Sequence, residues 1–272
     1  MVLFPHCKIN LGLFVLGKRN DGYHDISTCF YPIGWKDALE IIPGPSNNIS
    51  IGLSGIQIPG IPDNNLCVEA VKLVKKDFDL PGIRIHLHKS IPAGAGLGGG
   101  SSDAAFTLQI LDRMFHLYLD EEILTWYSSM LGSDCSFFLC DKPRLASGRG
   151  EVLSDIRIDL TGKTVVLVYP GFSINSASAY EQIKPQDRKT SIKEIIEYQP
   201  ISTWKNELVN DFEKVVFGRY PELESIKKSF YDQGACFASM SGSGSCIYGI
   251  FNEYPREPFQ FPAHYQIWTG LL

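Results

Sequence analysis

Residues 92–105 read PAGAGLGGGSSDAA, with five glycines at positions 94, 96, 98, 99 and 100. A strand-like run at residues 83–88 precedes this stretch, and a helical pattern at residues 102–115 follows it. A backbone without Cβ atoms can bend until successive N–H groups converge, and a following helix adds its unpaired N-terminal N–H groups and the positive end of its dipole. The stretch therefore predicts a cradle for a polyphosphate. Ser101 and Ser102 are placed to cap the helix or to reach a phosphate oxygen or a magnesium ion.

A flexible loop that ends in a serine N-cap is the alternative interpretation of the same residues. The strand–loop–helix context favours the anion cradle. No Gly-Lys-Ser/Thr follows the glycines, so the loop is not a Walker A sequence, and it is not a G-x-G-x-x-G dinucleotide loop either. A phosphate site here belongs to another class.

Composition limits what else the chain can be. Its 272 residues correspond to one large domain or two modest ones, and its formal net charge of −5 argues against a protein that coats nucleic acid. The seven cysteines are scattered and never spaced C-x-x-C, which predicts neither a zinc site nor a disulfide framework. We expect a cytoplasmic protein, because residues 1–20 show no signal-peptide pattern and no run is apolar enough to span a membrane.

Strand and helix patterns alternate without a strict β-α-β-α rhythm, which favours an α+β chain of two domains. We expect the first domain over residues 1–155 and the second over 156–272, with the last strand free to return to the first. Helical patterns cover residues 65–78, 102–115, 121–131, 206–217 and 222–232. Strand patterns cover residues 83–88, 164–169, 235–240 and 246–251.

Polar residues near the start of the chain suggest a second substrate. Lys8 and Asn10 are two residues apart, so both would point to the same side of a strand. Asp21-Gly22 is a turn dipeptide that would present Tyr23 and His24 at a strand end. Taken singly, Lys8 fits a solvated surface lysine and Tyr23 fits an aromatic of the core or rim.

Two later segments have a structural and a functional interpretation. Asp134 stands between a Gly-Ser turn and an apolar run, where it could cap the next helix or act as an isolated carboxylate. The run Met240-Ser-Gly-Ser-Gly244 lies between two strand patterns and is by itself most typical of a tight hairpin.

In their order along the chain, these segments resemble the three motifs of the GHMP kinases, the family of galactokinase, homoserine kinase and mevalonate kinase. The motifs are an N-terminal Lys/Asn strand, the central glycine-rich loop, and a late Ser-Gly-Ser-Gly turn. The resemblance spans residues 5 to about 251. It implies a fold of two α+β domains with the active site in the cleft between them, and a kinase that uses ATP and Mg²⁺.

The resemblance also implies roles for individual residues. Lys8 and Asp134 match the catalytic pair at the accepting hydroxyl, with Asn10 beside them. The substrate implied is a small cytidine diphosphate compound, with no nucleic acid or membrane as partner. The cytosine would stack on Tyr23, hydrogen-bond to His24 and be closed in by Tyr180, while Ser241 and Gly242 border the site. The residues that match the ATP site are Asn65, Lys89, Pro92, Gly94, Gly96, Leu97, Gly98, Gly99, Gly100, Ser101 and Ser102.

Two alternatives remain open at this point. One is another GHMP kinase, of the homoserine or mevalonate type. The other is a non-catalytic nucleotide-binding or RNA-binding protein on a similar α+β scaffold. The residues that contact the metal and the oligomeric state are not predicted.

Overall fold

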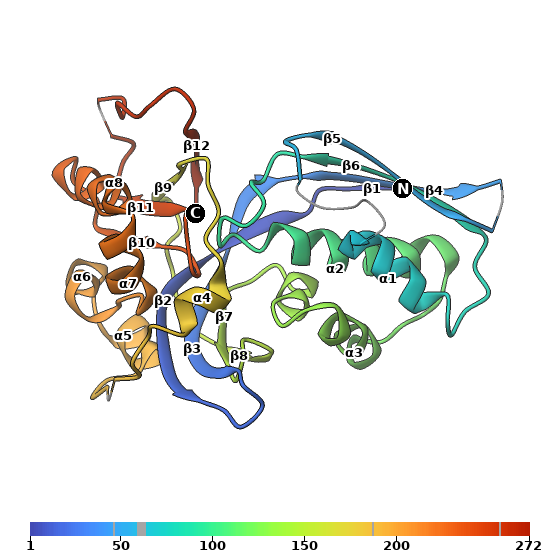
Figure 1. The fold of residues 1–272 in the computed structure, drawn as a ribbon, viewed down its shortest axis with the longest axis horizontal. Helices are drawn as coiled ribbons and strands as arrows, with labels where there is room; N and C mark the ends of the chain where they lie inside the picture. Colours follow the sequence, from blue (N-terminus) through green and yellow to red (C-terminus); the bar gives the residue numbers. More distant parts are fainter. Residues whose placement is uncertain (46, 59–63, 187, 256) are drawn as a thin grey trace. The chain divides into compact units, whose positions relative to one another are not determined.

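The computed structural model describes residues 1–45, 47–58, 64–186, 188–255 and 257–272. It divides the chain into two compact units, each of which is described by itself (Figure 1). Unit 1 comprises Met1–Cys7, Trp35–Ala93 and Gly98–Asp141. Unit 2 comprises Lys8–Gly34, Gly94–Leu97 and Lys142–Leu272.

Unit 1 is a four-stranded sheet covered by helices. The strands run in the order β1-β4-β6-β5, and their bounds are Val2–Leu3, Ala38–Gly44, Gly82–Lys89 and Ile49–Gly55. Strand β6 pairs antiparallel with β4 and parallel with β5. The helices are α1 (Leu66–Val74), α2 (Gly99–Phe115) and α3 (Glu121–Leu131), followed by a short 3₁₀ helix, η2 (Cys135–Leu139). Helices α1 and α2 lie along one face of the sheet (Figure 1).

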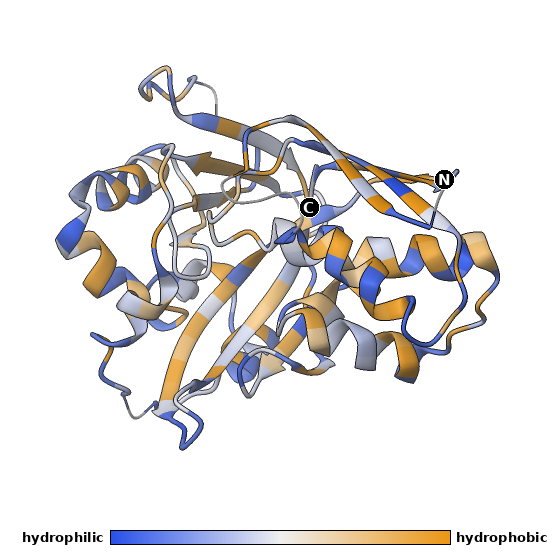
Figure 2. Cartoon of the chain, turned by 45° about the vertical axis from the view of Figure 1, so that its right-hand side comes forward, coloured by the Kyte–Doolittle hydropathy of each residue, from blue (hydrophilic) through white to orange (hydrophobic). Residues whose placement is uncertain are grey.

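The core of unit 1 follows from the sequence periodicity. Strand β6 buries every second side chain, including Ile83, Ile85 and Leu87. These side chains pack with the apolar stripes of the helices, among them Val71 of α1 and Leu108 of α2. The helices consequently show hydrophobic and hydrophilic segments in turn along their length (Figure 2).

Unit 2 contains two four-stranded sheets and most of the remaining helices. The first sheet has the order β2-β3-β7-β8, with bounds His6–Lys18, His24–Lys36, Arg144–Ser147 and Val152–Asp155. The second has the order β10-β11-β9-β12, with bounds Phe237–Met240, Ile247–Phe251, Thr164–Tyr169 and Gln266–Leu271. The helices are α4 (Ser176–Tyr180), α5 (Ile192–Tyr198), η3 (Ile201–Thr203), α6 (Trp204–Glu207), α7 (Phe212–Arg219) and α8 (Pro221–Asp232).

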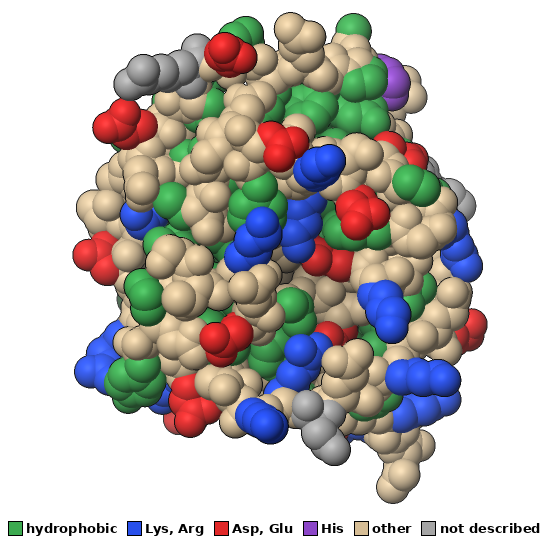
Figure 3. All heavy atoms as spheres, turned by 90° about the vertical axis from the view of Figure 1, so that its left-hand side faces the viewer, with side chains coloured by type: hydrophobic (Ala, Val, Ile, Leu, Met, Phe, Trp, Pro, Cys, Tyr) green, Lys and Arg blue, Asp and Glu red, His purple; other side chains and the backbone are tan. Residues whose placement is uncertain are grey.

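The β9 and β11 strands form the centre of the second sheet. The TVVLVY run of β9 is buried along its whole length, which explains why it lacks period-two alternation. Its Val166 and Val168 belong to a core that also contains Phe212 of α7 and Phe230 of α8. On the face drawn in Figure 3, acidic and basic side chains lie interspersed.

Most predicted elements are confirmed, and one is corrected. The predicted helix over residues 206–217 is broken into α6 and α7 by an extended segment around Asn210. Backbone hydrogen bonds join Leu13 of β2 to Val209 and Asp211, and the buried Asn210 amide donates to the carbonyl oxygens of Met240 and Gly242. These long-range bonds replace the helical ones that the local pattern favours.

The unit boundaries also differ from a single division at residue 155. Residues 8–34 and 94–97 belong to unit 2, although they precede that position. Strands β2 and β3 begin or end in unit 1 and run into unit 2, so the chain passes between the units several times. Among the described residues, no helix has the length and apolar character needed to cross a membrane.

Candidate active site

The glycine-rich loop has the backbone of an anion cradle. Gly94, Gly96 and Gly98 all have positive φ (+66°, +80° and +70°), and the residues between them do not. Such alternation turns successive N–H groups toward one side of the chain. Helix α2 begins at Gly99 with Gly98 as its N-cap, and no side chain caps it. The serine N-cap interpretation is therefore wrong, because Ser101 and Ser102 already lie inside the first turn.

The first half of the loop is held by the late glycine turn. Ser241 Oγ donates a hydrogen bond to the carbonyl oxygen of Gly96 at 2.9 Å, and the N–H of Cys246 donates to that of Ala95 at 3.1 Å. A Cβ at position 96 would lie 2.0 Å from the Ser241 carbonyl oxygen, so only glycine fits there. The predicted hairpin between β10 and β11 is confirmed. Its turn carries Ser241 and Gly242 to the loop.

Lys8 is buried, which contradicts the surface-lysine interpretation. It lies in β2 with 3% of its surface exposed, and its Nζ donates to Asn10 Oδ1 at 2.6 Å. The Asn10 amide donates in turn to Thr28 Oγ1 at 2.9 Å, and the Thr28 hydroxyl donates to the Gly12 carbonyl oxygen. The backbone N–H of Lys8 donates to the Leu97 carbonyl at the end of the loop segment of unit 2.

This chain of hydrogen bonds fixes the orientation of the Lys8 ammonium. Burying a lysine ammonium costs free energy, whereas an apolar side chain would fill the core without that cost. The Nζ also lies 4.8 Å from the centroid of the Phe30 ring, within cation–π range. A buried, oriented lysine next to a phosphate-type loop is typical of a functional site.

The rings of Tyr23 and His24 contact different partners, Arg149 and Tyr180 respectively. Tyr23 is 57% exposed at the turn before β3, and the Arg149 guanidinium lies 4.9 Å from its ring centroid. The His24 ring stacks on the Tyr180 ring, with centroids 4.9 Å apart and an interplanar angle of 13°. Tyr180 packs edge-on against Phe212 of the core. Unit 2 thus brings together the two aromatic residues His24 and Tyr180, which are 156 positions apart in the sequence.

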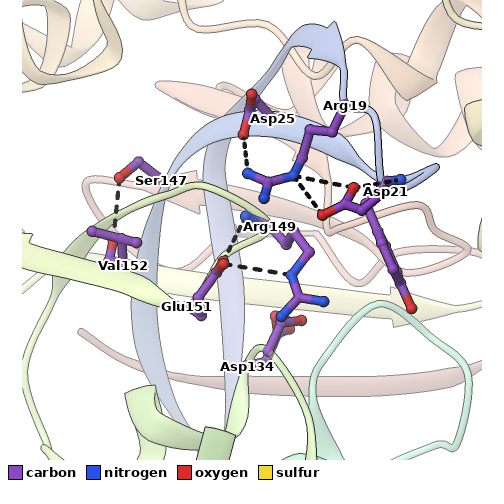
Figure 4. Close-up of polar contacts among 10 residues, drawn as sticks. Arg19, Asp21, Asp25, Asp134, Ser147, Arg149, Glu151 and Val152 are labelled. Carbon is purple, nitrogen blue, oxygen red and sulfur yellow. Dashed lines mark hydrogen bonds and ion pairs between the residues drawn. The ribbon is translucent and has the colours of Figure 1, made fainter.

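Acidic side chains fix the turn that presents Tyr23. The Asp21 carboxylate accepts the N–H of Tyr23 at 3.1 Å and pairs with the Arg19 guanidinium, which also reaches Asp25 (Figure 4). The predicted Asp21-Gly22 turn is confirmed, with Gly22 at φ +87°. Arg149 is held in the same way, since its N–H and Nε both donate to the Glu151 carboxylate (Figure 4).

Asp134 stands at the N-cap position of η2, but its side chain makes no capping hydrogen bond. The capping interpretation is therefore wrong, although the position is the expected one. Ser133 Oγ donates weakly to Asp134 Oδ1, at 3.4 Å. The neighbouring Cys135 is buried, and burial raises the pKa of its thiol to about 12, which argues against a thiolate nucleophile. Asp134 belongs to unit 1 and Lys8 to unit 2.

Several residues that the family resemblance assigns to the ATP site lie in unit 1, where the structure gives them defined roles. Asn65 is the N-cap of α1, and its Oδ1 accepts the N–H of Cys67 at 2.9 Å. Lys89 ends β6 and is buried, with Asp37 and Asp103 as ion-pair partners. Burial disfavours its ammonium, but the two carboxylates outweigh that effect and raise the pKa of Lys89. Pro92 is buried at the start of the loop.

Four residues that contact the predicted site residues were not predicted from the sequence. Asp103 lies inside the quoted loop motif, and Arg149 lies in a Gly-Arg-Gly run that carries no local signal for its contact with Tyr23. Asp37 and Thr28 carry no local signal, because their roles depend on partners far away in the chain.

The described part of the chain contains no cluster of three or more His, Cys, Asp or Glu side chains that could hold a metal ion. Mg²⁺ does not require such a cluster, since it usually binds through one or two protein ligands together with substrate phosphates and water. The Ser102 hydroxyl is buried and has no hydrogen-bond partner in the first turn of α2. This hydroxyl therefore fits a ligand of a nucleotide-borne metal.

Comparison with known proteins gives the class of this fold and site. Residues 65–142 match the family model of the GHMP kinases N terminal domain, and residues 191–260 match that of the GHMP kinases C terminal domain. The chain belongs to the GHMP kinase family.

The chain is also similar to individual members of that family. It is 48% identical to the 4-diphosphocytidyl-2-C-methyl-D-erythritol kinase of Bacteroides fragilis, over 93% of this chain and 92% of the relative. The enzyme of the same description from Cytophaga hutchinsonii is 48% identical over 94% of each chain. The crystal structure of a 4-(cytidine 5'-diphospho)-2C-methyl-D-erythritol kinase superimposes with a TM-score of 0.77 and 31% identity, over 92% of this chain and 90% of that one. The mevalonate kinase of Methanococcus jannaschii shares the fold, with a TM-score of 0.70 at 14% identity.

Proposed function

We propose that this protein is an ATP-dependent kinase that phosphorylates the 2-hydroxyl of 4-diphosphocytidyl-2-C-methyl-D-erythritol, in the methylerythritol phosphate route to isoprenoid precursors. The observation that carries this proposal is the high identity to relatives of that description over nearly the whole chain. The uncapped α2 terminus, the buried Lys8 and the exposed Tyr23 support it independently. Seven free thiols fit a reducing compartment, so we propose the cytoplasm as its location.

The donor side of the reaction uses the loop. The N–H groups of Gly94–Gly100 and the N-terminus of α2 would bind the ATP phosphates, and Mg²⁺ would share those phosphates with the hydroxyl of Ser101 or Ser102. The metal would supply charge neutralisation for the moving phosphoryl group. Ser241 would act indirectly, because its hydroxyl is committed to the carbonyl oxygen of Gly96.

The acceptor side uses a carboxylate and an ammonium. Asp134 would accept the proton of the substrate hydroxyl, and Lys8 would stabilise the negative charge that builds up on the oxygen and the phosphoryl group. Asn10 orients Lys8 through its 2.6 Å hydrogen bond. The cytosine would stack on Tyr23, with His24 and Tyr180 completing its site.

The test is an acceptor panel assayed with ATP. Purified protein is given the cytidine diphosphate alcohol, mevalonate or homoserine, with ADP release and ³¹P NMR of the product as readouts. We expect stoichiometric ADP and a new phosphomonoester signal with the cytidine compound alone. Transfer to mevalonate or homoserine would identify another GHMP kinase. Nucleotide binding without transfer to any alcohol would identify a non-catalytic protein.

A further inference from the structure

Three ionisable side chains lie buried together in unit 1, close to the glycine-rich loop in the sequence. Lys89 is the last residue of β6, Asp37 lies between β3 and β4, and Asp103 is the fifth residue of α2. Their exposed fractions are 3%, 1% and 2%. The Lys89 ammonium donates to Asp37 Oδ2 and, at 2.7 Å, to Asp103 Oδ2.

The cluster joins the two ends of the loop. Asp37 Oδ1 accepts the backbone N–H groups of Ser90 and Ile91, at 2.6 and 2.8 Å, and so fixes the chain as it enters the loop. Asp103 lies in the helix that the chain enters as it leaves the loop. Lys89 therefore links the entry and the exit of the loop through one ammonium group.

The ammonium also lies directly under the start of α2. A Cβ built on Gly99 would be 3.4 Å from Lys89 Nζ and 3.0 Å from Ile91 Cγ2. Gly99 is the first residue of the helix, where the unpaired N–H groups that bind an anion are found. A change in the position of Lys89 would move these N–H groups.

Stability alone does not explain such a cluster. Replacing a buried ion pair by apolar side chains of similar volume is often neutral or stabilising, because desolvation offsets the Coulomb attraction. Here one oxygen of the Asp103 carboxylate is buried without any hydrogen-bond partner, which adds to the cost. The hydrogen bonds of the cluster fix the position of both ends of the loop, which gives a functional reason for this cost.

We propose that Asp37, Lys89 and Asp103 form a positioning cluster that fixes the glycine-rich loop for the nucleotide phosphates, with Lys89 acting through the loop backbone. Lys89 is then a positioning residue whose ammonium does not touch the nucleotide. This inference rests on the proposed function, in that the loop must bind the phosphates of ATP.

The experiment compares Lys89→Met, Asp103→Leu and the double variant, each in the full chain. Affinity for a non-hydrolysable ATP analogue is measured by calorimetry, which needs no acceptor alcohol, and KM is measured separately for each substrate. Because small misplacements of binding groups are costly, we expect roughly 10–100-fold weaker analogue binding in each single variant and a similar loss in the double variant. KM for the cytidine substrate should stay unchanged. If Lys89→Met does not fold, Lys89→Gln, which removes the charge but keeps a hydrogen-bond donor, replaces it.

Tyr127→Phe is the matched control. It removes a 2.7 Å hydrogen bond from the buried Tyr127 to Asp77 in the same unit, and should lower the melting temperature without weakening analogue binding. Variants of the cluster that melt earlier but bind the analogue like wild type would show a purely structural role and overturn the proposal. Loss of affinity in Lys89→Met alone, with Asp103→Leu unaffected, would show direct contact and overturn it too.

The proposed function fails in a different way. If the wild type binds the analogue but transfers phosphate to no alcohol, the kinase assignment is wrong, whereas the affinities of the variants still decide the role of the cluster. If the wild type does not bind the analogue at all, the loop is not a phosphate site and both proposals are overturned.

Discussion

The hydroxyl of Ser241 donates a hydrogen bond to the carbonyl oxygen of Gly96 at 2.9 Å, across 145 residues of sequence. This contact brings two glycine-rich segments of unit 2 against each other. Gly242 takes part as well, since its own carbonyl oxygen accepts the Asn210 amide. The late turn therefore supports the loop, and the loop depends on residues far outside its own motif.

The first prediction concerns Gly96→Ala. The new Cβ would lie 2.0 Å from the Ser241 carbonyl oxygen, and the backbone at φ +80° disfavours any side chain. The loop must shift, so we expect KM for ATP to rise roughly 10–100-fold in steady-state assays. Gly162→Ala is the control, because Gly162 has the same φ of +80° and open space around it. Equal effects of the two substitutions would contradict the close-packing argument.

The second prediction concerns the proposed catalytic pair. Asp134→Asn should lower kcat by about 10²–10⁴-fold, the usual contribution of a general base, while it keeps the shape of the side chain. Lys8→Met should act on the same step, so the double variant should lose far less than the product of the single losses. Multiplicative losses would show that the two residues act separately. Normal turnover by Asp134→Asn would remove it from catalysis.

Local pattern was enough to predict elements whose stabilising contacts are local or periodic. Helix α3 covers the predicted residues 121–131, with Asp120 as its N-cap, and β9 covers the predicted 164–169. The loop could be predicted because the spacing of its glycines reflects the positive φ angles of its backbone. The same pattern placed the start of α2 three residues late, since Gly99 and Gly100 have poor helix propensity and are helical here only in context.

Features that depend on distant partners could not be predicted. The sequence around Asn210 carries no signal that its amide donates to the carbonyl oxygens of Met240 and Gly242. The local pattern therefore predicts one continuous helix where α6 and α7 are separate. The family resemblance assigns Lys89 to the ATP site, but it does not predict the ion pairs of Lys89 with Asp37 and Asp103. A lysine that is buried in this way can be recognised only from the folded structure.

The third prediction concerns cytosine recognition. Aromatic stacking contributes about 1–3 kcal/mol per base in nucleic-acid complexes, so Tyr23→Ala should raise KM for the cytidine substrate roughly 5- to 150-fold. KM for ATP should not change. Tyr254→Ala is the control, since Tyr254 is exposed to a similar extent (59%) in the same unit. Parallel increases in both KM values for Tyr23→Ala would place Tyr23 outside the cytosine site.

The fourth prediction concerns the pH dependence of stability. Burial raises the pKa of the Asp103 carboxyl from 3.8 to about 7; the Lys89 ammonium opposes this shift and Asp37 adds to it. Between these two values the folded state binds more protons than the unfolded state, so the free energy of unfolding falls as pH rises. The stability that protonated Asp103 contributes is complete at low pH and is lost as pH rises through about 7.

Asp103→Asn tests this, because it keeps the shape of the side chain and cannot titrate. Urea unfolding followed by circular dichroism between about pH 5 and pH 8 should show a steeper decline for the wild type than for Asp103→Asn. Asp155→Asn serves as a control, since Asp155 is an exposed carboxylate whose pKa is lowered by Lys142 and Arg144 and which stays ionised over this range. If the wild type and Asp103→Asn decline with the same slope, Asp103 is ionised throughout. Lys89 would then pair with two ionised carboxylates over this whole pH range, rather than only above about pH 7.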